Sequence, residues 1–347
     1  MATGQEEEKQ KTGVSTLNTK QIEAPLPLRD NDVPKRQLER EIGMEHQKTV
    51  NTFQRLKEQE TEPQSAWGDT SNEPEAGPSC HIIGFTGAKG GVGTTTVALN
   101  VAMALVQAGQ RVIFVELSPH LGSAAWFLKV PQISSLGDSP AHFNGINRDF
   151  VIQLLLPHST GLNVLCMSPW AQEVGYQVST ELLTVLFREL RGLADYLVLD
   201  FSLEPSFPSI CFLNHCQIID LVMETDSICL ALAKGQLAFI RSLCETPIFV
   251  TPVNRSGIPP ADGLHGIQDQ VGFDVPVMIP PASELCHTAS LKGLPIVCIN
   301  PNSVPALQFT QLSEQFRCYL TEDSSEAKRT RRDRDRRKGN RRNQGGW

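Results

Sequence analysis

Short apolar runs alternate with segments of helical periodicity along most of the chain after residue 80. Continuous apolar runs are typical of strands in a parallel sheet that is covered on both faces. Apolar residues three and four positions apart indicate helices that pack on such a sheet. The expected strands are 81–86, 110–117, 161–167, 196–200, 218–223 and 247–251, and the expected helices are 97–108, 121–129, 150–156, 180–193 and 227–242. The alternation predicts an α/β fold with one doubly wound, mostly parallel sheet.

Composition divides the 347 residues into three parts. Residues 1–79 are rich in Gln, Glu, Lys, Thr and Pro, and ordering them would cost more entropy than their few apolar side chains return, so we expect them to be mostly disordered. Within them, residues 39–60 carry a sparse apolar stripe, typical either of a frayed, solvated helix or of a helix that binds a partner. Residues 80–320 form the expected folded domain, and residues 321–347 an expected disordered basic tail.

Charge is distributed very unevenly. The formal net charge is -7, but residues 328–347 contain ten Lys or Arg and two Asp, a local charge of +8. Residues 328–342 have almost no apolar side chain, so they lack the amphipathic stripe of a membrane-inserting helix. Such a segment can bind DNA, RNA or anionic lipid headgroups, and a purely solubilising role fits equally well. The pattern leaves these alternatives open.

The nine cysteines form no C-x-x-C pair, and most lie in or beside apolar runs. This usage is typical of small buried side chains in a reducing compartment. Two Cys/His groups, 211–216 and 286–287, lack zinc-site spacing, so we expect no metal there. The N-terminus lacks an apolar signal segment, and no apolar run approaches the about 20 residues that span a bilayer. We expect a soluble cytoplasmic protein, with a peripheral position at the membrane or cell pole left open.

A glycine-rich turn at residues 87–96 joins the first expected strand to the first expected helix. Gly90, Gly91 and Gly93 let the backbone approach a ligand closely, so that successive N–H groups converge on phosphate oxygens. The positive end of the following helix adds to this field. In the first helical turn, the Thr95 hydroxyl is placed to bind the Mg²⁺ that accompanies a nucleoside triphosphate. The expected binding residues are Lys89, Gly90, Gly91, Val92, Gly93, Thr94, Thr95 and Thr96, with ATP and Mg²⁺ as cofactors.

A second candidate metal ligand ends the strand 196–200. Its four apolar or aromatic residues are followed by Asp200, which burial of the strand would aim at the mouth of the glycine-rich turn. There it could hold Mg²⁺ through water, as Thr95 would hold it directly. The alternative is an aspartate that only caps the strand end. The spacing of roughly 110 residues after the glycine-rich turn favours the metal role.

The turn departs from the strict pattern G-x-x-x-x-G-K-[ST], because Ala88 stands at the first glycine and Thr94 at the lysine. The stretch Lys89-Gly-Gly-Val-Gly-x-Thr95-Thr96 nevertheless resembles the deviant P-loop of the ParA/MinD family of ATPases. A residue other than lysine at Thr94 looks most like the CpaE/TadZ branch, ParA-like proteins that place pilus-assembly machinery at the pole. The resemblance implies a nucleotide-sandwich homodimer in which Lys89 reaches the partner's nucleotide.

The resemblance covers residues 80–320 and includes further segments. Asn254 and Arg255 resemble a V-N-R element whose asparagine reads the adenine edge, although asparagine also suits an ordinary turn. Residues 273–295 resemble a late strand followed by a helix and turn. Ser118 stands where the family carries the second aspartate of D-x-D-P-Q, which organises the attacking water and the metal shell; Glu116 keeps the first acid.

We therefore expect an ATP-binding, dimerising localisation switch of the CpaE/TadZ kind with weak or absent hydrolysis, partnered by pilus or secretion machinery. An active ParA-like ATPase that partitions DNA or other cargo stays open, as does a pseudo-ATPase scaffold that recruits partners through residues 1–79. Dinucleotide-dependent redox chemistry is disfavoured, because the turn lacks G-x-G-x-x-G.

Overall fold

The computed structural model describes residues 80–117, 122–130, 147–167, 180–203, 212–213, 215–258, 260 and 263–322. The predictions for residues 1–79, for Ser118 and for the basic segment 328–342 lie outside these residues. The described residues all fall within one compact unit of the chain. Among them, no helix has the length and apolar character that crossing a membrane requires.

Seven strands in the described residues form one sheet in the order β3-β4-β2-β5-β1-β6-β7. Neighbouring strands are parallel except for β3 and β4 at one edge, which are antiparallel. This confirms the predicted doubly wound, mostly parallel α/β fold. The strands are β1 His81–Gly87, β2 Val112–Leu117, β3 Leu156–Pro157, β4 Asn163–Leu165, β5 Tyr196–Phe201, β6 Ile218–Glu224 and β7 Ile248–Val253.

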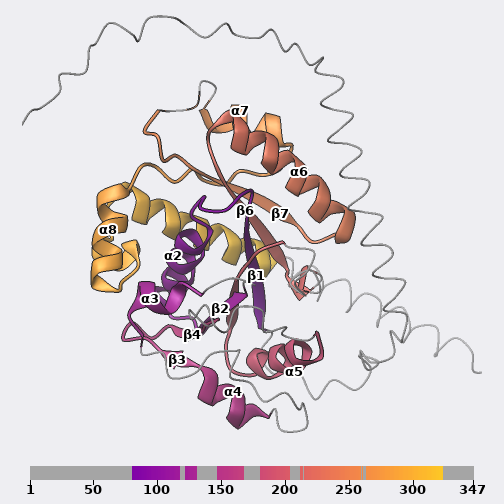
Figure 1. The fold of residues 1–347 in the computed structure, drawn as a ribbon, viewed down its shortest axis with the longest axis vertical. Coiled ribbons are helices and arrows are strands. Elements are labelled where there is room, and N and C mark those ends of the chain that lie inside the picture. The colour runs from indigo at the N-terminus through magenta and orange to yellow at the C-terminus, as the bar shows by residue number, and fades with distance from the viewer. Residues whose placement is uncertain are drawn as a thin grey trace, which may run out of the picture. The chain divides into compact units, whose positions relative to one another are not determined.

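Helices cover both faces of the sheet (Figure 1). On one side α2 packs on β1, β2 and β5 and also contacts α9, while on the other side α5 packs on β5 and α6 on β6. Since both faces are covered, every residue of β2 and β5 is buried, which is why these strands have continuous apolar runs. The helices are α2 Thr94–Gln107, α3 Ala124–Leu128, α4 Arg148–Leu154, α5 Thr180–Arg191, α6 Ser227–Leu243, α7 Gly263–Val271, α8 Ser283–Lys292 and α9 Ile296–Ile299, and residues 304–322 are also helical.

One transverse row of the sheet contains three acidic residues. In register across five strands lie Glu116 of β2, Asp200 of β5, Phe85 of β1, Asp220 of β6 and Phe249 of β7. Residues in register point to the same face of a sheet. All three carboxyl groups are therefore on the same face of the sheet, and all three are buried.

The segment 273–280 differs from the expectation of a late strand. It makes only isolated parallel bridges to β7, Phe249 with Asp274 and Val253 with Ile279. Pro276 and Pro280 have no backbone N–H and so cannot donate to a continuous ladder. The segment lies along the edge of β7 without becoming an eighth strand.

Candidate functional site

The glycine-rich loop leaves β1 after Gly87 and enters α2 at Thr94. Gly91 has φ 79° and Gly93 φ 102°, in the region that favours glycine. A Cβ built at either residue, or at Gly90, would meet no described atom within 4 Å. The Ala88 N–H donates to the Val222 carbonyl at 2.9 Å and fastens the loop to β6. The start of the loop is therefore tied to β6, and its glycines leave one face open.

The first turn of α2, residues 94–96, completes the loop. Gly93 is the N-cap, and no side chain caps this end. Because the first N–H groups of a helix have no acceptor within it, they are available to an anion, and the helix dipole favours negative charge there. Val92 is fully buried and anchors the loop in the core. The residues predicted to bind phosphate are thus brought together at one helix N-terminus.

The structure joins the two predicted metal ligands, Thr95 and Asp200. The Thr95 hydroxyl lies close enough to the carboxyl group of Asp200 to favour its ionised form, and Asp200 is only 8% exposed. Burial raises the pKa of Asp200 to about 7; the nearby charge of Glu116 adds to this rise, and the Thr95 hydroxyl opposes it. A buried carboxyl beside a hydroxyl fits Mg²⁺, which takes few protein oxygens and completes its shell with water and phosphate.

Glu116 is in register with Asp200, but its oxygens are already occupied. They accept backbone N–H bonds from Ser123 at 2.7 Å, Ala124 at 3.1 Å and Met167 at 3.3 Å. A Cβ added at Gly122 would lie 2.2 Å from the Met167 carbonyl, so only glycine fits this close approach. Burial raises the pKa of Glu116 despite these bonds. This acid holds the start of α3 in place, next to the candidate metal site.

Lys89 contributes a positive charge at the mouth of the loop. Its Nζ lies 3.0 Å from Oε2 of Glu224, at the end of β6. This hydrogen bond raises the pKa of Lys89. The other oxygen of Glu224, Oε1, pairs with Nη1 of Arg255 at 2.7 Å, and the same Nη1 donates to the carbonyl of Gly91 at 2.8 Å. Two cations at the loop therefore share one carboxylate.

Sequence reasoning missed Glu224. The signal that could have found it is its position one residue beyond the expected strand 218–223. The carboxyl ends of parallel strands meet at one edge of a sheet, so a charged residue there is a candidate for any site that the glycine-rich loop forms.

Asn254 directs its side chain into its own loop. Its Nδ2 donates to the Ile258 carbonyl at 3.1 Å, and its Oδ1 accepts from the Ser256 hydroxyl at 3.2 Å and the Gly257 N–H at 3.0 Å. These are the bonds of the turn interpretation that the sequence left open. The adenine-reading role of Asn254 stays a prediction.

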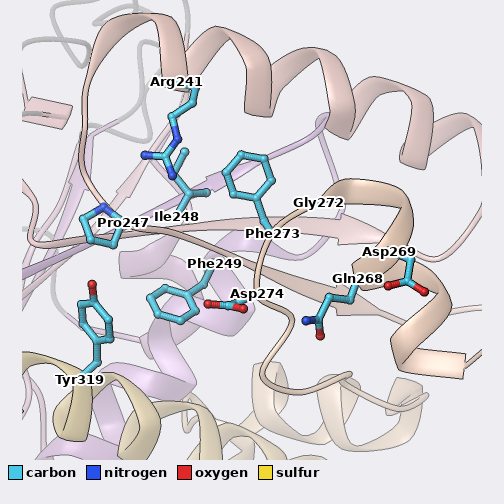
Figure 2. A pocket seen from close by; sticks show the side chains of 10 residues that line it. All are labelled: Arg241, Pro247, Ile248, Phe249, Gln268, Asp269, Gly272, Phe273, Asp274 and Tyr319. Atoms are coloured by element: carbon cyan, nitrogen blue, oxygen red, sulfur yellow. The ribbon is translucent and has the colours of Figure 1, made fainter.

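A cavity of about 680 Å³ lies at the other end of β7, beside Pro247 and Ile248 (Figure 2). The guanidinium of Arg241 lies 5.5 Å from the centroid of the Phe273 ring, and the ring of Tyr319 meets Phe249 edge-on at 5.4 Å. None of the predicted site residues lines this cavity. The glycine-rich loop, at the carboxyl ends of the strands, is a separate location.

Comparison with known proteins agrees with this fold. Residues 80–129 match a family model described as an AAA domain; the match spans the loop, α2 and β2. No curated protein matches the chain.

Solved structures match over about two thirds of the chain. A ParA family ATPase from Chlorobium tepidum matches with a TM-score of 0.60 and 20% identity, over 67% of this chain and 98% of that one. The cell division ATPase MinD of Pyrococcus furiosus matches with a TM-score of 0.57 and 22% identity, over 69% and 99%. The septum site-determining protein MinD of Pyrococcus horikoshii, complexed with Mg-ADP, matches with a TM-score of 0.55 and 20% identity, over 68% and 96%. The fold is that of the ParA and MinD ATPases.

Proposed function

We propose that the chain is a ParA/MinD-type switch that binds ATP with Mg²⁺ and pairs with a second copy of itself. The observation that carries this proposal is the contact between Thr95 and Asp200 at the mouth of an open glycine-rich loop. The MinD of Pyrococcus horikoshii, which shares the fold, is complexed with Mg-ADP. The loop N–H groups and the first turn of α2 would hold the phosphates.

Thr95 and Asp200 would hold the metal, Thr95 directly and Asp200 through water. When bound, the ion would neutralise charge that develops on the phosphates. Its charge would also favour the ionised form of Asp200, so metal binding would release a proton from this buried carboxyl near neutral pH. Lys89, at the rim of the loop and 34% exposed, is placed to leave Glu224 and reach a partner's nucleotide.

Weak or absent hydrolysis belongs to the same proposal. Thr94 stands at the position of the lysine in the strict pattern, and α2 contains no other basic residue that could replace it. Ser118 stands at the position of a second strand-end aspartate. Loss of fixed positive charge or of water positioning costs orders of magnitude in the rate of phosphoryl transfer. By the resemblance to CpaE/TadZ proteins, the output would be the placement of pilus or secretion machinery at the membrane or cell pole.

Calorimetry with ATP in the presence and absence of Mg²⁺, together with sedimentation, tests the proposal. We expect saturable binding that needs Mg²⁺ and a shift from monomer to dimer, with slow turnover. Asp200→Ala should strongly weaken Mg²⁺-dependent ATP binding, whereas Asp269→Ala, in the distant cavity, should not change it. If no heat is released and the protein stays monomeric at every ATP concentration, the proposal fails and the scaffold alternative gains.

A working ATPase that partitions DNA or other cargo is the second candidate, favoured by the local charge of +8 in residues 328–347. A fast steady-state rate that Asp200→Ala abolishes would support it over the slow switch. Deleting residues 328–347 should then weaken DNA binding and reduce its dependence on salt. An unchanged affinity and salt slope would remove its main support.

A further inference from the structure

The glycine-rich loop lacks a cation where loops of the strict pattern have one. Lysine at that position reaches the β- and γ-phosphates, but here the position is Thr94, and its hydroxyl turns back toward β1: a Cβ added at Gly87 would lie 2.6 Å from it. Lys89 also lies in this loop, but the proposed function assigns it to the partner's nucleotide, so the terminal phosphates bound here need positive charge from another residue.

Arg255 brings positive charge to the loop from 164 residues away. Its Nη1 donates to the carbonyl of Gly91 at 2.8 Å, on the loop whose glycines Gly90, Gly91 and Gly93 have open space at their Cβ positions. The side chain is 61% exposed, so it can rotate without losing buried packing. A guanidinium is suited to this role because its planar N–H groups bind phosphate oxygens in pairs.

The backbone that carries Arg255 is held firmly. The preceding residue, Asn254, bonds to the backbone of Gly257 and Ile258 through its side chain and to the Ile279 carbonyl through its N–H, at 2.8 Å. Asn254 is 5% exposed. These bonds fix the loop after β7, so the base of the Arg255 side chain stays beside the glycine-rich loop while its end is free to move.

Glu224 balances part of this charge. Its two oxygens pair with Lys89 at 3.0 Å and Arg255 at 2.7 Å, so two positive charges meet one negative charge. Asp226 also faces Lys89, but its carboxylate accepts the N–H groups of Ile228 and Cys229 as the N-cap of α6. Phosphate oxygens would therefore compete with one shared carboxylate for both cations.

We propose that Arg255 is the phosphate-binding cation that takes the place of the lysine replaced by Thr94, and that Glu224 is its counter-ion when no phosphate is bound. This inference rests on the proposed ATP-binding function. It assigns Arg255 to binding of the terminal phosphates rather than of the base or the ribose. Because this side chain is exposed and mobile, it does not restore the fixed charge that fast hydrolysis needs.

Binding of ATP and of AMP, each with Mg²⁺, to the full chain and four variants tests the role. Arg255→Gln should weaken ATP binding by about 10-fold or more and leave AMP binding nearly unchanged, because AMP lacks the terminal phosphates. Arg255→Lys should recover part of the loss. Glu224→Gln should tighten ATP binding several-fold by releasing both cations. Arg188→Gln is the matched control, since Arg188 is also exposed, at 69%, and pairs with a glutamate, Glu189, at 3.1 Å; it should change nothing.

The outcomes separate the two proposals. If the unmodified chain does not bind ATP, the proposed function fails and this inference fails with it. If the unmodified chain binds ATP and Arg255→Gln binds it equally well, only the role of Arg255 is overturned. Equal weakening of ATP and AMP would also overturn it, because that result indicates a displaced loop. Circular dichroism of each variant confirms that the fold is retained.

Discussion

Two aspartates in neighbouring regions of the sheet have nearly the same surroundings, but only one of them lies beside a site that a ligand can enter. Asp200 in β5 and Asp220 in β6 flank Phe85 in one row and point to the same face. Each is buried beside one threonine hydroxyl, and burial raises the pKa of each to about 7.

The difference is where each threonine lies. The partner of Asp200 is Thr95, in the first turn of α2 beside the open loop. The partner of Asp220 is Thr251 in β7, at 3.0 Å, and the second oxygen of Asp220 has no hydrogen-bond partner among the described residues. Burial alone therefore does not mark a functional carboxyl. A functional carboxyl is indicated instead by its proximity to a site that a ligand can enter.

The largest effect that would test this comparison is on stability. Because the folded pKa of Asp220 lies above its unfolded value, the folded state binds the proton more tightly, and Asp220 makes the protein less stable as the pH rises from about 4 to about 7. Asp220→Asn removes this term and should stabilise the protein at pH 8 by on the order of 4 kcal/mol at most. Urea denaturation of both proteins at pH 4.5 and pH 8 measures the difference. A difference that does not change with pH would contradict the raised pKa.

The next effect is on nucleotide binding and separates the two acids. Asp200→Asn should weaken Mg-ATP binding by about 100-fold, since an amide binds Mg²⁺ poorly and carries no charge. Asp220→Asn serves as the matched control and should leave the affinity within about 2-fold. Calorimetry with and without Mg²⁺ measures both. Equal losses in the two variants would mean that the row of acids acts as one electrostatic unit.

The smallest effect comes from the two threonines. Thr95→Val removes a proposed metal ligand and should weaken Mg-ATP binding by about 10-fold without destabilising the fold by more than about 1 kcal/mol. Thr251→Val removes the hydroxyl at Asp220 and should destabilise the fold by roughly 1–3 kcal/mol without changing affinity. Denaturation and binding assays on the same samples distinguish them. If both variants lose only Mg-ATP affinity, or both lose only stability, the proposed difference between Asp200 and Asp220 is wrong.

Much of this arrangement could be predicted from the sequence because buried parallel strands have apolar runs that stand out, and a glycine-rich loop follows the first of them. Thr95 and Asp200 are both predicted as metal ligands for this reason. The structure places them close together, and their metal role stays a prediction. The lateral order of the strands could not be predicted from these runs, so the row that contains Glu116, Asp200 and Asp220 was not foreseen.

Contacts between residues far apart in the sequence also could not be predicted from the order of apolar and polar residues. Arg255 and Gly91 are 164 positions apart, and only the placement of β7 two strands from β1 brings them together. The two-residue β3 and the helix α7 were missed because a short edge strand and a polar helix give weak periodic signals. The late segment is expected as a strand only from its resemblance to the family, and its prolines prevent a continuous ladder with β7.

The edges of the sheet limit how two copies can join. At one edge β3 is only Leu156–Pro157, and proline offers no N–H to an incoming chain. At the other, β7 is bridged by Asp274 and Ile279. Among the described residues, neither flank provides a long open strand for a neighbour to extend. Self-assembly by continuous hydrogen bonding from one molecule's sheet to the next is therefore discouraged, and association is left to loops and helices.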